Sequence, residues 1–237
     1  MSALFSTFVS QPILNTLIFL YNVIPGHDFG IAIILTTIIL KFVLLPLSKK
    51  QIESQKKMQD LQPQIKELQE KNKSNKEKQT KELMQFYKDN KVNPFGGCLP
   101  LIVQLIFLIA IYRIIIQISS SGFVINAQNL YSFVANPGNI NHLFIGLVDL
   151  TKPNIILAIL AAAAQFWQTK MLMQKQPLSP SKDGTPDFAQ MMSKQMLFLG
   201  PIMTLFIGIK FAAGLALYWL VSTLFAVFQQ LYIFKKK

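Results

Sequence analysis

The sequence predicts an all-α integral membrane protein with five transmembrane helices, and three observations support this prediction. Hydrophobic residues make up 51% of the 237 residues and charged residues only 14%, whereas a soluble domain carries about 25% charged residues. Five apolar stretches approach the length of roughly 20 residues that a membrane-spanning helix needs. Most of the 23 Lys and Arg residues lie between or after these stretches, which is the positive-inside pattern and not a nucleic-acid-binding surface.

The N-terminal part predicts an interfacial helix followed by the first span. We expect residues 1–25 to form an amphipathic helix that lies in the membrane interface, and no cleavable signal peptide, because the stretch has no charged n-region. The first transmembrane helix is expected over residues 29–47, with Asp28 as its N-cap. Lys41 is the one charge in this span. A lysine there costs about 2.5–3.5 kcal/mol at a helix centre, so it either snorkels to the nearer interface or serves a functional site.

Residues 48–92 predict a cytosolic helical hairpin. This segment holds twelve lysines and no long apolar run. Met58, Leu61, Ile65 and Leu68 follow a spacing typical of a helix that packs on a partner helix, and Pro63 is expected to start a new helical segment or to kink the first one. A solvated surface and attraction to anionic lipids account for most of the lysines.

The rest of the chain alternates between spans and loops. We expect a second transmembrane helix over 99–118, an extracytoplasmic loop over 119–153, a third helix over 154–173, a cytosolic loop over 174–194, a fourth helix over 195–211 broken at Gly200-Pro201, a fifth helix over 213–234, and a short basic cytosolic tail over 235–237. The twelve lysines of the hairpin stand against a single lysine in the loop over 119–153. This asymmetry places the N-terminus outside and the C-terminus in the cytoplasm.

Polar side chains within the spans are expected to converge in the inner half of the bilayer. Because an unpaired polar group in hydrocarbon is costly, such a set predicts a hydrophilic, cationic groove that is open to the cytosol. Its candidate residues are Thr37, Lys41, Gln104, Gln165, Gln168, Ser222 and Gln229.

The residues also exclude several function classes. No predicted span contains an Asp or Glu, which argues against proton- or cation-coupled transport. The sequence has no HExxH, GxSxG or P-loop motif, and its two histidines and single Cys98 offer neither a metal site nor a redox pair. We therefore expect no enzyme, no catalytic residue, no metal and no cofactor.

Four motifs follow one another along the chain: TTIILKFVLLPLSKKQ, LQPQIKELQEK, NPFGGCLPLIVQLIFLIAIYR and GLALYWLVSTLFAVFQQ. In this order, with a charged hairpin between the first two spans, they resemble the YidC/Oxa/Alb family of membrane protein insertases. The resemblance covers nearly the whole chain. It is strongest to the short bacterial form that lacks the large periplasmic domain.

This resemblance implies a location, a mechanism and partners. It implies a multi-pass protein of the bacterial plasma (inner) membrane, with five helices around a groove that is closed outside and open to the cytosol and lipid. Family members insert small membrane proteins alone and assist a Sec translocon with larger ones. The expected partners are therefore nascent membrane proteins, membrane lipids, the Sec translocon and the ribosome, without sequence-specific nucleic-acid binding. With so short a basic tail, ribosome contact is expected to rely on the hairpin and the loop over 174–194.

The resemblance also assigns residues. Lys41 stands where the family has its groove arginine, and it keeps the charge but loses the planar, five-donor fork of arginine. Family contacts with the nascent chain correspond to Thr37 and Tyr112, and an apolar slide corresponds to the second and fourth spans.

The sequence thus predicts a membrane protein insertase and chaperone. It would move hydrophilic segments of nascent proteins through the groove and release their apolar segments to lipid. Two alternatives remain: a small channel or solute transporter, which would need a through-pore, and a non-catalytic membrane assembly subunit, which would tolerate Lys41→Leu.

Overall fold

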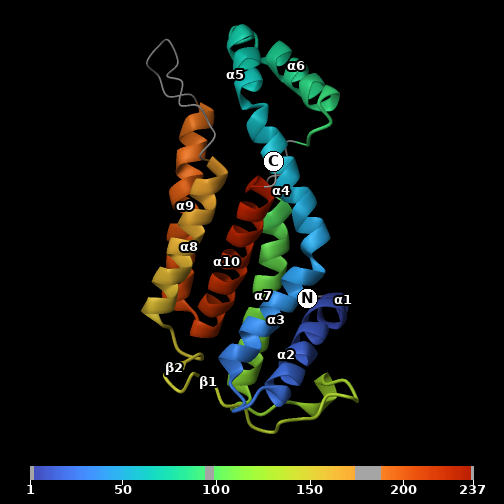
Figure 1. Cartoon of the computed structure of the whole chain (residues 1–237), viewed down its shortest axis with the longest axis vertical. Coiled ribbons are helices and arrows are strands. Elements are labelled where there is room, and N and C mark those ends of the chain that lie inside the picture. Colours follow the sequence, from blue (N-terminus) through green and yellow to red (C-terminus); the bar gives the residue numbers. More distant parts are fainter. Residues whose placement is uncertain (1–2, 94–98, 174–187, 236–237) are drawn as a thin grey trace.

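The computed structural model describes residues 3–93, 99–173 and 188–235, and nearly all regular structure in these ranges is helical (Figure 1). The N-terminal and hairpin elements are α1 (Ala3–Phe5), a π-helical turn (Ser6–Ser10), α2 (Gln11–Val23), α3 (Phe29–Val43), α4 (Leu45–Asp60), α5 (Gln62–Lys71) and α6 (Lys76–Asp89). The remaining elements are α7 (Leu99–Ser120), a 3-10 turn (Ala127–Asn129), β1 (Leu143–Phe144), β2 (Val148–Asp149), α8 (Ile155–Met173), α9 (Phe188–Lys210) and α10 (Ala213–Lys235).

The apolar helices agree with a helical membrane protein. In the described ranges, α7 and α10 are long and apolar enough to cross a membrane, and α3 with α4 make a third candidate if this bent pair is one span. The apolar parts of α8 and α9 are shorter, over Ile155–Met171 and Leu197–Lys210. Residues 94–98, most of the predicted loop over 174–194 and the end of the tail at 236–237 lie outside the described residues.

The first predicted span begins as expected but ends earlier. Asp28 caps α3, because one of its carboxylate oxygens accepts a hydrogen bond from the Ile31 amide at 2.9 Å. The helix was expected to continue to residue 47, but α3 ends at Val43 and the chain bends by 67° into α4. Pro46 lies in the first turn of α4, where its missing N–H is tolerated, whereas its ring would clash inside a continuous helix.

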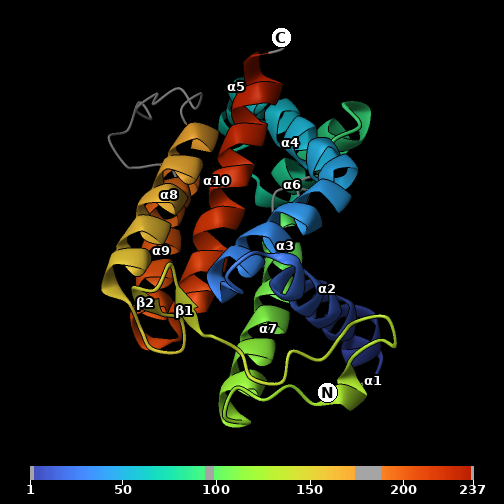
Figure 2. The same ribbon diagram turned by 60° about the horizontal axis from the view of Figure 1, so that its bottom comes forward.

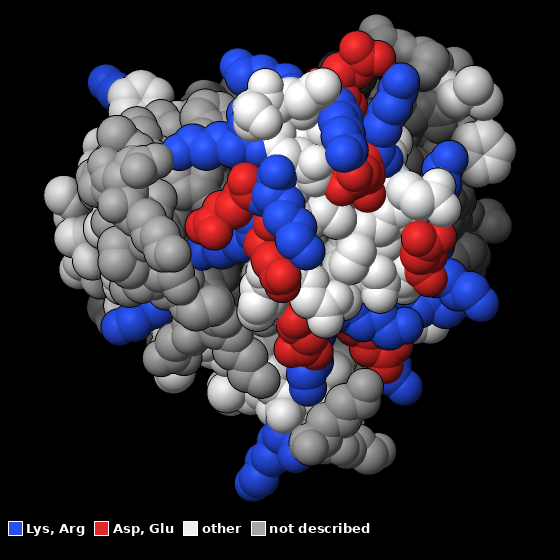
Figure 3. Space-filling model, turned by 90° about the horizontal axis from the view of Figure 1, so that it is seen from above, with Lys and Arg blue, Asp and Glu red and all other residues white. Residues whose placement is uncertain are grey.

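The hairpin consists of α4, α5 and α6. As predicted for Pro63, a new helix starts there: α4 ends at Asp60 and α5 begins at Gln62. Side-chain amides join α5 to α6, since Asn72 Nδ2 donates to Glu82 Oε2 at 2.6 Å and Gln79 Nε2 donates to the Gln69 carbonyl at 2.7 Å. Figure 3 views the molecule from the hairpin end and shows lysines and acidic residues interspersed there.

The five apolar helices pack unequally. The closest pair is α8 with α9, while α10 packs on α8 and α3 and also contacts α7. Alanines at one face of α8 allow this approach: a Cβ atom added to Gly208 of α9 would lie 2.7 Å from the Cβ atom of Ala158. These small residues bring the backbones of α8 and α9 together, as small residues do between membrane helices.

Two features of α9 differ from the sequence prediction. Residues 188–194 were expected to belong to a loop, but they form the start of α9. The helix was also expected to break at Gly200-Pro201, yet it is continuous through Pro201. Close packing along α8 supports the helix at the proline, where a lone helix would lose a backbone hydrogen bond.

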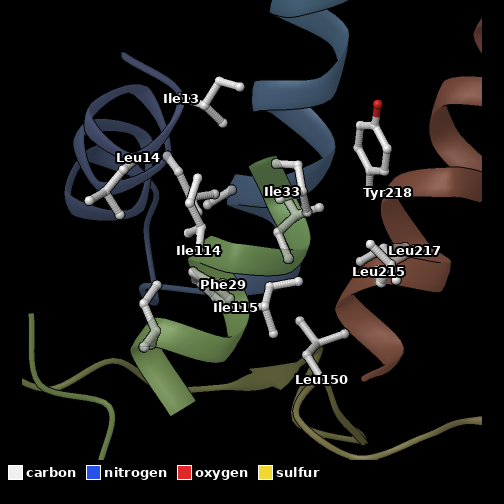
Figure 4. Close-up of a cluster of buried hydrophobic side chains, with 14 of the residues drawn as sticks. Ile13, Leu14, Phe29, Ile33, Ile114, Ile115, Leu150, Leu215, Leu217 and Tyr218 are labelled. Atoms are coloured by element: carbon white, nitrogen blue, oxygen red, sulfur yellow. The ribbon is translucent and has the colours of Figure 1, made fainter. Parts of the chain in front are cut away.

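The main hydrophobic core lies at the end of the molecule opposite the hairpin (Figures 1 and 4). Side chains from α2, α3, α7 and α10 meet there beneath the loop that follows α7, and Leu17, Ile33 and Leu150 are almost fully buried. Asn15 of α2 ties the loop down by donating to the Asn129 carbonyl at 3.0 Å and accepting from the Tyr131 amide at 2.6 Å. The loop therefore closes this end of the helix bundle. That α2 lies in the membrane interface stays a prediction.

Candidate functional site

A polar cluster joins α3, α7 and α10 on the hairpin side of the hydrophobic core. The Lys41 ammonium donates a hydrogen bond to Gln104 Oε1 at 3.3 Å, and the Ser222 hydroxyl donates to the same oxygen at 2.9 Å. Ser222 is buried, whereas Lys41 and Gln104 are half-buried. Three of the residues predicted to converge thus meet at one amide oxygen.

The Gln104 amide has an unusual balance of partners. Its oxygen accepts two hydrogen bonds, but its Nε2 atom is buried and has no hydrogen-bond partner among the described residues. An unpaired buried donor is costly, on the order of 1–3 kcal/mol, and it calls for water or another acceptor. The site therefore offers two donors with unused capacity, the Lys41 ammonium and the Gln104 N–H groups.

A second cluster, between α8 and α10, is built on Gln165. Its Oε1 atom accepts from Trp219 Nε1 at 3.2 Å and from the Thr223 hydroxyl at 3.4 Å. The sequence identified Gln165 but missed Trp219 and Thr223. Helical spacing could have revealed them, since Ser222 and Thr223 follow Trp219 by three and four residues on one helix.

The other predicted residues are spread over the same helices. The buried Thr37 hydroxyl donates to the Ile33 carbonyl of its own helix at 2.7 Å, and Gln168 is half-buried one turn after Gln165. Gln229 Nε2 donates to the Ser48 hydroxyl at 2.6 Å and so links the end of α10 to α4. None of these three joins the Lys41 cluster by a hydrogen bond recorded among the described residues.

Tyr112 lies toward the end of the molecule away from the hairpin, near the turn between α9 and α10. Its ring meets the ring of Phe211 edge-on, with centroids 5.2 Å apart. Among the described residues α9 packs closely on α8 and α7 contacts α10, with little contact between α7 and α9 themselves. The Tyr112–Phe211 pair therefore connects α7 to the end of α9 at the side where the core lies.

The helices around the site carry basic residues but no acidic ones. The sequences of α3, α7, α8, α9 and α10 contain no Asp or Glu, so the Lys41 ammonium has no acidic partner on these helices. Within the described ranges, no group of three or more His, Cys, Asp or Glu residues could hold a metal ion. The chemistry that the arrangement favours is attraction of anionic or hydrogen-bond-accepting groups.

Comparison with known proteins identifies the family. The family model described as 60Kd inner membrane protein matches residues 19–237. The chain belongs to this family. This confirms the resemblance to the YidC/Oxa insertases, and together with the apolar helices it indicates a multi-pass inner-membrane protein.

Relatives in this family are named for one activity. The "Membrane protein insertase YidC" of Fusobacterium nucleatum is 37% identical over 93% of this chain and 94% of that protein. A relative of the same name from Pelobacter propionicus is 34% identical over 97% of this chain but only 39% of its own length, and "Membrane protein insertase YidC 1" of Listeria monocytogenes is 34% identical over 90% and 67%. These names describe an insertase and not an enzyme.

Proposed function

We propose that this chain is a membrane protein insertase that also acts as a chaperone for nascent membrane proteins. The observation that carries the proposal is the Lys41 ammonium, which sits among neutral amides and hydroxyls where α3, α7 and α10 meet. Family membership and the names of the relatives support the same activity. Its substrates are nascent membrane proteins, and its surroundings are membrane lipids.

The proposed arrangement has five spans: α3 with the start of α4, and then α7, α8, α9 and α10. The lysine-rich hairpin marks the cytosolic side by the positive-inside rule, which puts the N-terminus outside and the C-terminus in the cytoplasm. The loop over 119–153 then covers the outer ends of the helices. Burial of the outer core and the Tyr112–Phe211 contact support a groove that is closed outside and open toward the cytosol.

Insertion begins with a hydrophilic or acidic segment of the substrate. This segment enters beside Lys41, where the ammonium and the unpaired N–H groups of Gln104 replace part of its hydration. The cost that this reduces is several kcal/mol for each unsatisfied polar group in hydrocarbon. Because attraction and hydrogen bonding suffice, Lys41 has no catalytic duty.

The apolar segment of the substrate leaves along α7 and α9. Both helices expose large apolar side chains outward, among them Ile102 and Leu105 on α7 and Ile202 and Phe206 on α9. A substrate helix that moves along these two outward faces is in contact with lipid. Burial of its apolar surface supplies the driving free energy, so no nucleotide is needed.

The hairpin and residues 174–194 are proposed to meet larger partners. Lysines on α4, α5 and α6 are interspersed with acidic residues, which suits a hydrated surface that contacts anionic headgroups, the ribosome or substrate segments. Cooperation with the Sec translocon on larger substrates is part of the proposal.

The test is insertion of a small single-spanning protein with an acidic N-terminal segment into liposomes that contain the purified chain. The wild type should insert the substrate, Lys41→Arg should retain most of the activity, and Lys41→Leu should lose about tenfold, as expected for loss of about 1.5 kcal/mol of charge-assisted hydrogen bonding. Lys170→Leu is the matched control, because Lys170 is an exposed lysine near the end of α8. Wild-type liposomes that insert no more substrate than empty ones would refute the proposal.

A further inference from the structure

The turn between β1 and β2 presents two large apolar side chains away from the protein. Leu147 is 86% exposed and Ile145 is 64% exposed. The turn lies near the outer ends of α3 and α8 and close to the connection between α9 and α10 (Figures 1 and 2). Nothing in the insertase mechanism described above uses these residues.

The backbone of this turn makes the exposure more informative. The Leu147 amide donates to the Phe144 carbonyl at 3.0 Å, and the two residues between them, Ile145 and Gly146, have φ angles of 53° and 69°. Turns with two positive φ angles favour Asn-Gly or Asp-Gly, and a β-branched residue at such an angle is an outlier. A water-facing turn would gain from Asn at position 145, so the isoleucine indicates an apolar surrounding.

The base of the turn is fixed to the ends of the membrane helices. Ile145 donates its amide to Asp28 Oδ2 at 2.6 Å, and the same carboxylate caps α3 through its other oxygen. The ring of Phe144 occupies the space that a Cβ atom at Gly30 would fill. Two residues with large exposed side chains are therefore held in a defined direction, close to the start of α3.

The segment after β2 is fixed as well. The Gly214 amide donates to the Leu150 carbonyl at 2.9 Å, and the Ala213 amide donates to the Lys152 carbonyl at 2.8 Å. A few residues further on, α8 begins with Ile155 and Ile156, whose exposed fractions are 61% and 66%. The turn and the start of α8 both expose large apolar side chains at this end of the molecule, and the two lie near each other (Figures 1 and 2).

We propose that Ile145 and Leu147 anchor the β1–β2 turn in the outer interface of the lipid bilayer. The occupant is lipid, because the turn lies beside the start of α8, whose exposed isoleucines face lipid in the proposed arrangement. Lipid burial would also offset both the exposure of these side chains and the disfavoured backbone of Ile145. The anchor would hold the outer ends of α3, α8 and α10 at a fixed depth while the groove admits substrate. It rests on the proposed spanning arrangement of α8 but not on insertase activity.

The test measures where position 147 lies in the reconstituted full-length protein. In a chain whose single cysteine is replaced by serine, Leu147→Cys carries an environment-sensitive fluorophore in vesicles of phosphatidylethanolamine and phosphatidylglycerol. Ile156→Cys is the lipid benchmark. Lys71→Cys, on the hairpin with a side chain 76% exposed, is the water benchmark. Quenching is compared between aqueous iodide and lipids that carry a spin label near the headgroup.

The proposal expects the label at position 147 to behave like the label at position 156. Its emission should be blue-shifted, spin-labelled lipid should quench it strongly, and iodide should quench it several-fold less than the label at position 71. Quenching by iodide as strong as at position 71 would overturn the anchor. Protection from both quenchers would also overturn it, because the turn would then be covered by protein. A label at position 156 that lies in water would instead refute the spanning arrangement of α8 itself, and the anchor with it.

Discussion

Two glutamines of this protein make the same local geometry in different electrostatic settings. Gln104 and Gln165 each accept two hydrogen bonds at a single amide oxygen, and each receives at least one of them from α10. At Gln104 one donor is the Lys41 ammonium, and the amide nitrogen is buried without a partner in the described structure. At Gln165 both donors, Trp219 and Thr223, are neutral.

We interpret this difference as one between a binding site at Gln104 and a structural contact between helices at Gln165. An amide whose oxygen accepts only neutral donors between two packed helices stabilises their contact. An amide that holds a cation by its oxygen while its own N–H groups stay unpaired keeps binding capacity in reserve. We therefore expect substitutions at Gln104 to affect insertion, and substitutions at Gln165 to affect the association of α8 with α10.

The largest contrast should come from Gln104→Leu. This change removes the acceptor of Lys41 and fills the polar space with an apolar side chain, so insertion of an acidic substrate should fall about tenfold, the equivalent of about 1.5 kcal/mol. The free energy of unfolding should fall by no more than about 1 kcal/mol, because removal of the buried and unpaired Nε2 atom partly offsets the loss of the acceptor of Lys41 and Ser222. Liposome insertion and thermal unfolding in detergent measure the two quantities.

A substrate variant tests the reason for that effect. When the acidic residues of its N-terminal segment are changed to amides, the deficit of Gln104→Leu should shrink, since there is less charge for Lys41 to attract. A loss of insertion that is equal for the acidic and the neutral substrate would contradict a role for the cation. A large loss of stability would show that Gln104 mainly stabilises the packing of α3, α7 and α10.

A smaller effect, on the other side of the comparison, is expected for Gln165→Leu. The Trp219 indole and the Thr223 hydroxyl would both lose their recorded acceptor. Hydrogen bonds between membrane helices contribute about 0.6 kcal/mol each on average, so the free energy of unfolding should fall by about 1 kcal/mol. Insertion of acidic and neutral substrates should decrease equally, and only as far as less protein is folded. A selective defect with acidic substrates would place Gln165 in the groove beside Lys41.

The sequence predicted which polar residues matter better than it predicted which of them contact one another. Helical spacing and membrane depth were enough to select Lys41, Gln104 and Ser222, because a polar residue inside an apolar span needs a partner. They could not distinguish the partners of Gln104 from those of Gln165, because that depends on which helices pack together and at what rotation. Trp219 was missed because indole is read as an apolar side chain, although its N–H is a donor that needs an acceptor.

Helix ends were predicted well where a local signal exists and poorly where packing decides. Asp28 and Pro63 act on their immediate neighbours, and α3 and α5 start where these residues predict. The early end of α3 follows from Pro46 together with the docking of α4 on α10, where Gln229 contacts Ser48. The continuity of α9 through Pro201 likewise depends on α8, which no local pattern within α9 reveals.

The smallest expected effect, that of Trp219→Phe, gives the finest test of the comparison. Phenylalanine keeps most of the apolar surface of the indole but removes the N–H group that reaches Gln165 at 3.2 Å. Because Thr223 still donates to the same oxygen, the amide stays partly satisfied, and the free energy of unfolding should fall by only about 0.6 kcal/mol. In a double-mutant cycle with Gln165→Leu this loss should disappear, since the acceptor is then gone. Thermal unfolding of the four proteins in one detergent measures the coupling. If Trp219→Phe lowers the free energy of unfolding as much in the Gln165→Leu background as in the wild type, the indole acts through packing. The hydrogen bond from Trp219 to Gln165 would then not stabilise the contact between α8 and α10.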